Sequence, residues 1–85
     1  MAWIYVLESI RDSVHYVGST SKRVEERLKR HNKGDYRFTK GHRPWKVVHA
    51  EVFSSLSQAV SRERFLKSGV GRKELKKILA QEAGI

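Results

Sequence analysis

Five polar or aromatic side chains stand at positions that packing alone does not explain: Tyr5, Tyr16, Arg27, His31 and Glu63. Arg27 and His31 are four residues apart, so on a helix they share one edge and stack a guanidinium beside an imidazole. Glu63 falls in a helical stripe that is otherwise apolar, where an unpaired buried carboxylate would cost several kcal/mol. A metal ion or a basic partner would remove that cost.

These side-chain types suit the hydrolysis of a phosphodiester. That reaction needs a base for the attacking water and a cation beside the charge that develops on the phosphoryl group. One carboxylate can hold a divalent ion mostly through water, as Mg²⁺ prefers, and the ion polarises the phosphoryl oxygen and steadies the leaving group. Tyrosine, with a reference pKa of about 10, is a base at neutral pH only where a nearby cation favours the phenolate. His31 would orient a tyrosine hydroxyl or relay its proton.

Each of the five side chains also has an ordinary structural explanation. Strand tyrosines pack their rings and leave the hydroxyl in water. Arg27 can pair with Glu26 or face solvent. A histidine near a helix C-terminus is favoured by the helix dipole, and Glu63 can pair with Lys67 one turn later. The residue types therefore leave both explanations open.

Two strands carry the tyrosines. Residues 3–7 form an apolar run rich in β-branched and aromatic side chains, which is typical of a largely buried strand. Residues 14–17 are expected to pair back with it antiparallel across a polar loop at residues 8–13. Alternation along the strands then allows both tyrosine hydroxyls to point toward the sheet end where the first helix begins.

A helix over residues 22–34 carries the arginine and the histidine. Gly18 is expected to form a tight turn between strand and helix, and Thr20 or Ser21 to cap the helix N-terminus. Gly34 is the expected left-handed residue at the C-terminal end.

The C-terminal half must bring Glu63 to the same place. The expected elements are a polar basic loop over residues 35–44, a strand over 45–53, a helix over 56–67 and a last helix over 72–81. One of Ser54, Ser55 and Ser57 is expected to cap the middle helix, and Gly69 and Gly71 to break the chain before the last. The order is therefore β, β, α, β, α, α.

Composition narrows the class of protein. The chain has 85 residues, so we expect one domain, residues 1–85. A net charge of +9 favours a polyanionic partner, nucleic acid before membrane. Without cysteine there is neither a disulfide nor a thiolate metal site, and no apolar run approaches the roughly 20 residues that span a bilayer. Because the N-terminus also lacks a signal-peptide pattern, we expect a cytoplasmic location.

The sequence resembles the GIY-YIG nuclease family, most closely its small single-domain bacterial members. Trp3-Ile4-Tyr5 stands where the first motif would be, and Tyr16-Val17-Gly18 where the second would be. Residues 19–31 match the helix with the family's active-site Arg and His, and residues 59–67 match the later helix with its metal-binding Glu. The match covers nearly the whole chain, and motifs at this spacing form a strong signal.

The resemblance implies an α/β (α+β) fold, a three-stranded antiparallel sheet flanked by helices, with the active site on the sheet. It implies a DNA endonuclease that uses one Mg²⁺ or Mn²⁺ ion per site. Tyr5 and Tyr16 would be the paired tyrosines, with Tyr5 preferred as the general base. Arg27 would stabilise the phosphate charge and Glu63 would hold the metal. His31 matches a family position that is often histidine.

Further contacts are expected outside this group. Basic residues expected to contact nucleic acid are Lys22, Arg23, Arg30, Lys40, Arg43 and Lys67. His42 would add a polar contact from the basic loop. DNA is the expected substrate, with RNA not excluded, and binding by so small a domain should be sequence-tolerant and fall steeply with salt.

The sequence departs from the family pattern at three places, of which Val17 for Ile in the second motif is a conservative change. Trp3 replaces the Gly of the first motif, which changes a backbone position and no catalytic group. Many members place an Asn after the metal-binding helix, where this chain has residues 69–73 without Asn. Two rival hypotheses follow: a basic nucleic-acid-binding module with a relic site, and a subunit that takes its specificity from a protein partner.

One geometric condition decides between a working site and scattered motifs. Tyr5, Tyr16, Arg27 and Glu63 must converge around one pocket. A Glu63 side chain on the far side of the sheet from the other three would contradict the nuclease hypothesis.

Overall fold

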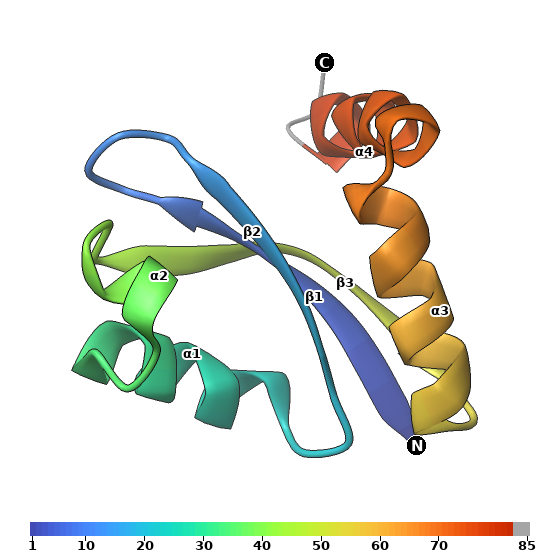
Figure 1. Cartoon of the computed structure of the whole chain (residues 1–85), viewed down its shortest axis with the longest axis horizontal. Helices are drawn as coiled ribbons and strands as arrows, with labels where there is room; N and C mark the ends of the chain where they lie inside the picture. The colour runs from blue at the N-terminus through green and yellow to red at the C-terminus, as the bar shows by residue number, and fades with distance from the viewer. Residues whose placement is uncertain (83–85) are drawn as a thin grey trace.

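The computed structural model of the chain describes residues 1–82, and a three-stranded antiparallel sheet lies at its centre (Figure 1). β1 (Ala2–Ser9) is the middle strand, with β2 (His15–Thr20) along one edge and β3 (Trp45–Phe53) along the other. The expected fold class, a sheet flanked by helices, is confirmed. The expected domain also includes residues 83–85, which lie outside the described residues.

Helices cover both faces of this sheet (Figure 1). α1 (Val24–Lys33) packs on one face, and α3 (Leu56–Lys67) and α4 (Gly69–Glu82) pack on the other. Because neighbours in a strand alternate, Ile4 lies among the apolar side chains of α3 and α4, while Tyr5 lies among those facing α1. Each large apolar side chain buried in this way contributes about 1.5–3 kcal/mol. The apolar run in β1 therefore holds both halves of the molecule together.

The two strands of the hairpin are longer than the sequence predicts. β1 continues to Ser9, so that the connection covers residues 10–14, and β2 runs from His15 to Thr20 at its far end. The predicted turn at Gly18 is wrong, because this residue lies inside β2 opposite Tyr5. A Cβ atom on Gly18 would stand 2.5 Å from Cζ and Oη of Tyr5. The position excludes a side chain because the tyrosine ring covers it.

The start of α1 also differs from the prediction, since neither Thr20 nor Ser21 caps it. Thr20 is the last residue of β2, and its hydroxyl accepts a hydrogen bond from Nε of Arg27 at 3.2 Å. Arg23 occupies the N-cap position without a side-chain cap bond. At the other end Gly34 has a φ of 91°, which confirms the predicted left-handed residue.

The strand over residues 45–53 and the helix over 56–67 are confirmed. Ser55 caps α3, its Oγ accepting a hydrogen bond from the amide of Gln58 at 3.3 Å. The predicted loop holds an additional short helix, α2 (Arg37–Lys40).

The predicted break at Gly69 and Gly71 is wrong, because both glycines lie in the first turn of α4. Ser68 alone separates α3 from α4, and its Oγ accepts a hydrogen bond from the amide of Gly71 at 3.1 Å. A Cβ atom on Gly71 would stand 1.6 Å from the carbonyl oxygen of Phe65. Glycine here permits close packing of the two helices. Within residues 1–82, no helix combines the length and apolar character that a membrane crossing requires.

Candidate active site

Tyr5 lies on the α1 face of the central strand, with its ring over the backbone of Gly18. The residue is 3% exposed, and its hydroxyl lies 3.0 Å from Nε2 of His31. Burial is the main cause that raises the pKa of Tyr5; the neighbouring Tyr16 adds to the increase, and Arg27 opposes it. Tyr5 is therefore a neutral phenol at pH 7.

His31 is the buried polar centre of the site, with 1% of its surface exposed. Its Nδ1 lies 2.8 Å from Oγ1 of Thr39, and that hydroxyl donates a hydrogen bond to the Tyr36 carbonyl at 3.5 Å. Every partner is satisfied when the imidazole proton is placed on Nδ1. Nδ1–H then donates to the Thr39 hydroxyl, and Nε2 accepts from the Tyr5 hydroxyl. Burial, and to a lesser extent Arg27, lowers the pKa of His31 to about 4. The imidazole is therefore neutral at pH 7 and can accept a proton from Tyr5.

Two hydroxyl groups hold the guanidinium of Arg27. Its Nε donates to Oγ1 of Thr20 at 3.2 Å, and its Nη1 donates to Oη of Tyr36 at 2.7 Å. The ring of Tyr36 in turn lies against His31, with centroids 4.4 Å apart. The remaining N–H groups of Arg27 are left to bind an anion in a fixed orientation.

Sequence reasoning assigned no role to Tyr36 or Thr39. Both lie in the segment predicted as a basic loop, where α2 turns them toward α1. Their only sequence signal is an aromatic and a hydroxyl residue among basic ones, which does not indicate which side chain they contact. Recognising them required the packing of α2 against α1.

Tyr16 stands beside this network on the edge strand and is half-buried. Its ring centroid lies 5.0 Å from that of His31 and 6.2 Å from that of Phe38. The ammonium of Lys67 lies 5.3 Å from the centre of the Tyr16 ring, a cation–π contact. Tyr16 therefore connects the histidine to the end of α3.

Glu63 comes from α3, on the other face of the sheet from Tyr5 and Tyr16, and its carboxylate meets the edge strand at Ser19. The convergence that the nuclease hypothesis requires is therefore made through Lys67 and not by a direct hydrogen bond to either tyrosine or to Arg27. Because β2 is an edge strand, a side chain from α3 can meet it at that edge. Oε1 of Glu63 accepts a hydrogen bond from Oγ of Ser19 at 2.5 Å, and Oε2 accepts one from Nζ of Lys67 at 2.6 Å. Since that ammonium also contacts Tyr16, the carboxylate lies at the rim of the tyrosine cluster. The ordinary structural explanation for Glu63, an ion pair with Lys67 one turn later, is thus present as well.

His42 does not join this cluster by a hydrogen bond. Its Nδ1 lies 2.7 Å from Oδ2 of Asp12 in the hairpin connection, and its ring packs against Phe38 and Trp45. This contact lowers the pKa of the Asp12 carboxyl. His42 thus ties the hairpin to α2.

The predicted nucleic-acid contacts fall into separate groups. Lys22 and Arg30 surround a small hollow of about 80 Å³ together with Arg27. Arg23 pairs with Glu25 on the exposed side of α1 at 3.5 Å. Arg43 and Lys40 lie against each other near the C-terminal end of α1, where Nε of Arg43 donates to the Lys40 carbonyl at 2.9 Å. Lys67 belongs to the site itself.

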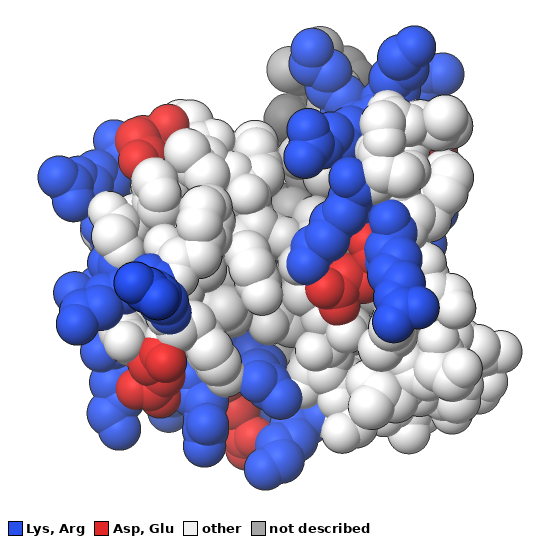
Figure 2. Space-filling model, in the orientation of Figure 1, with Lys and Arg blue, Asp and Glu red and all other residues white. Residues whose placement is uncertain are grey.

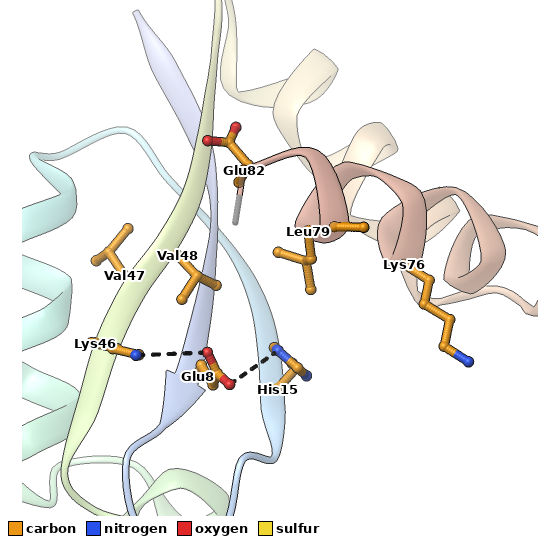
Figure 3. Close-up of a pocket in the computed structure, with 9 residues that line it drawn as sticks. Glu8, His15, Lys46, Val47, Val48, Lys76, Leu79 and Glu82 are labelled. Atoms are coloured by element: carbon orange, nitrogen blue, oxygen red, sulfur yellow. Dashed lines mark ion pairs between the residues drawn. The ribbon is translucent and has the colours of Figure 1, made fainter. Parts of the chain in front are cut away.

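A groove of about 630 Å³ lies away from the tyrosines, between the sheet and α4 (Figure 3). Glu8 lies between two basic side chains there, 4.0 Å from Nζ of Lys46 and 4.0 Å from Nε2 of His15. Neither Tyr5 nor Tyr16 lines it. Across residues 1–82, no three His, Cys, Asp or Glu side chains gather in a way that would hold a metal ion by themselves.

Comparisons with known proteins agree on one family. Residues 1–77 match the family model described as the GIY-YIG catalytic domain. A UPF0213 protein of Syntrophus aciditrophicus (strain SB) is 42% identical over 67 residues, covering 76% of this chain and 75% of that protein. A UPF0213 protein of Natronomonas pharaonis is 37% identical over 83 residues, covering 96% and 94%. The solution NMR structure of a UPF0213 protein from Bacillus halodurans superposes with a TM-score of 0.53 at 29% identity, covering 92% of this chain and 85% of that one.

Proposed function

This chain belongs to the GIY-YIG catalytic domain family, and from that membership we propose that it is a metal-dependent endonuclease acting on DNA. The observation that carries the proposal is the arrangement at the end of β2. There His31 accepts the Tyr5 hydrogen bond and lies against the Tyr16 ring, and Tyr36 holds the guanidinium of Arg27 beside the imidazole. Lys67 contacts both the Tyr16 ring and the carboxylate of Glu63. These are the base, the cation and the ion-binding group that phosphodiester hydrolysis needs.

Tyr5 acts as the base through His31. The Tyr5 oxygen takes a proton from the attacking water while its own proton passes along the 3.0 Å hydrogen bond to Nε2. This coupling avoids a free phenolate, which the raised pKa of Tyr5 disfavours. Because the pKa of His31 is about 4, the protonated imidazole is a transient carrier that loses its proton to solvent water, and solvent water protonates the departing oxygen, so the proton balance closes after each cleavage.

Arg27 binds the scissile phosphate and stabilises the charge that develops on its oxygens. Its orientation is set beforehand by Thr20 and Tyr36, so little reorganisation is needed when the substrate arrives. A guanidinium is suited to this role because it stays charged and presents several N–H groups in one plane.

Glu63 fits the role of a metal ligand as a lone carboxylate. A hard ion such as Mg²⁺ or Mn²⁺, held by one carboxylate and otherwise by water, suits a partly exposed side chain with no acidic cluster around it among residues 1–82. The ion would polarise the phosphoryl oxygen and stabilise the leaving group. The ammonium of Lys67 already contacts Oε2, so we propose that it gives up this contact when the ion binds.

A second candidate function is nucleic-acid binding without cleavage. The observation in its favour is that both oxygens of Glu63 are already engaged, one by Ser19 and the other by Lys67. In that case the tyrosine network would only stabilise the fold, and the basic surface would do the binding. A protein partner that supplies specificity is compatible with either function.

A cleavage panel distinguishes these functions. Duplex, nicked, branched and single-stranded DNA and matching RNA substrates would be incubated with Mg²⁺, Mn²⁺ or EDTA. We expect metal-dependent nicking that Glu63→Ala abolishes and that Arg27→Ala lowers by about 100- to 1,000-fold. Glu25→Ala, which removes an exposed carboxylate of α1, is the matched control and should cut like the wild type. Equal rates for the wild type and Glu63→Ala, or binding without any cleavage, would favour the second candidate.

A further inference from the structure

A second groove adjoins the site on its α4 side, and we propose that it holds the nucleic-acid strand next to the cleaved phosphate. This α4 groove has a volume of about 690 Å³ and rests on the apolar side chains of Val17, Leu66, Leu75 and Leu79. Its cationic residues are Lys67, Arg72, Lys73 and Lys76. The proposal rests on the proposed nuclease function and adds the path of the substrate, which the predicted basic contacts on α1 and α2 do not include.

The charge of the α4 groove is one-sided. No Asp or Glu among residues 1–82 lines it, whereas the groove around Glu8 is lined by two carboxylates, Glu8 and Glu82, beside Lys46 and Lys76. Within the same described range, neither Arg72 nor Lys73 nor Lys76 forms an ion pair. A polyanion is therefore the ligand that complements the α4 groove.

The spacing of these cations along α4 favours the same ligand. Arg72 and Lys76, which both line the groove, are four residues apart. Like charges at this separation face each other on a helix and destabilise it. A phosphate backbone bound beside these cations would offset their mutual repulsion. Placing like charges at this spacing therefore favours binding of a polyanion and does not stabilise the free helix.

The groove is continuous with the candidate active site. Tyr16 and Lys67 line the groove and also contact His31 and Glu63, respectively. Figure 2 shows one group of basic side chains over α4 and the end of α3, and another around α1 and α2. A strand whose phosphate lies at Arg27 can therefore continue past Tyr16 into the α4 groove. There the cations would contact its phosphates and the apolar floor its sugars and bases.

The test is a binding measurement in EDTA, so that cleavage does not enter. Fluorescence anisotropy of a fluorescein-labelled DNA strand would be recorded over a series of KCl concentrations. The test variant is Lys73→Gln/Lys76→Gln. The matched control is Lys46→Gln/Lys77→Gln, which removes the same charge from positions outside the α4 groove.

We expect the slope of log affinity against log salt to become shallower by about 1.4 for the groove variant, as for two lost phosphate contacts on a single strand, and by much less for the control. Equal changes in the two variants, or no change in either, would overturn the proposal. Amide chemical shifts of the unaltered chain give a second readout, with perturbations expected over residues 66–76. Perturbations confined to α1 and α2 would also overturn it.

The two proposals fail in different ways. If the chain binds DNA through the α4 groove but cuts nothing with either metal, the nuclease proposal fails and the groove stands. If the chain cuts DNA while the groove variant binds DNA like the wild type, the groove proposal fails and the nuclease proposal is retained.

Discussion

The two sides of the edge strand β2 are built differently. On the α1 side, Tyr5, His31 and Thr39 are buried and joined in one chain of hydrogen bonds. On the α3 side, the side chains of Glu63 and Lys67 are 20% and 46% exposed and pair with each other. The buried network has one arrangement before any substrate arrives, whereas the exposed pair can exchange partners. Proton transfer is more efficient when the donor and the acceptor are fixed in advance. A carboxylate that binds a metal ion must instead be able to release the lysine ammonium that occupies it.

The buried side can be broken at Gly18 without changing any polar group. In Gly18→Ala the new Cβ would stand 2.5 Å from the Tyr5 ring, so the ring must move and its hydrogen bond to His31 must lengthen. We expect the free energy of unfolding to fall by about 2–5 kcal/mol, the sum of overpacking and a lost buried hydrogen bond. Urea unfolding followed by circular dichroism measures this, and DNA cleavage should be lost.

Gly41→Ala is the matched control for that substitution. Nothing lies within 4 Å of the position that its methyl group would take, and its φ of −77° suits alanine. Unfolding free energy and cleavage should stay near those of the wild type. Equal destabilisation by the two alanines would show that the fit of Tyr5 over Gly18 does not matter.

Lowering the pH should destabilise the buried α1 side of β2 through His31. Its pKa is about 4 in the folded chain against 6.5 unfolded, so between these values the unfolded chain binds a proton that the folded chain does not. The free energy of unfolding therefore falls as pH drops through this window, by about 3 kcal/mol in all. Asp12 and Glu51, whose carboxyl pKa values are lowered, add losses at more acidic pH.

A His31→Gln variant isolates this contribution. It should be less stable than the wild type at pH 7, yet show a flatter decline in unfolding free energy as the pH falls between the unfolded and folded pKa values of the histidine. Urea unfolding at a series of pH values gives both curves. Parallel curves for the two proteins would mean that His31 is not held neutral by the fold.

The smallest effect on stability is expected on the exposed side. Lys67→Met removes an i,i+4 ion pair worth about 0.3–0.5 kcal/mol, so unfolding should hardly change. Because the ammonium no longer occupies Oε2 of Glu63, the affinity for Mn²⁺ should rise by about 2- to 5-fold. Electron paramagnetic resonance of free Mn²⁺ measures this. Lys73→Met is the control, and an equal rise there would mean that general charge, not exchange at Glu63, controls binding.

Much of the fold follows from local sequence patterns. The boundaries of β3 and α3 and the left-handed Gly34 were predicted correctly, since a run of strand formers, a serine cap and a terminal glycine act within a few residues. The wrong predictions concern single glycines. Gly18 and Gly71 resemble turn or break signals, but each is glycine because another segment passes over it. Such a contact leaves no mark in neighbouring residues.

The candidate chemistry could be read from the order of amino acids alone: two tyrosines, an arginine, a histidine and a glutamate, on two strands and two helices. How these groups meet depended on the packing of the folded chain. The sheet order places β2 at an edge, so that Glu63 from one face can approach a network built on the other. Packing also made Tyr36 the partner of Arg27 and Ser19 a partner of the Glu63 carboxylate. The physical reason is that residue periodicity sets which face of an element a side chain takes, whereas contacts between elements depend on how the whole chain packs.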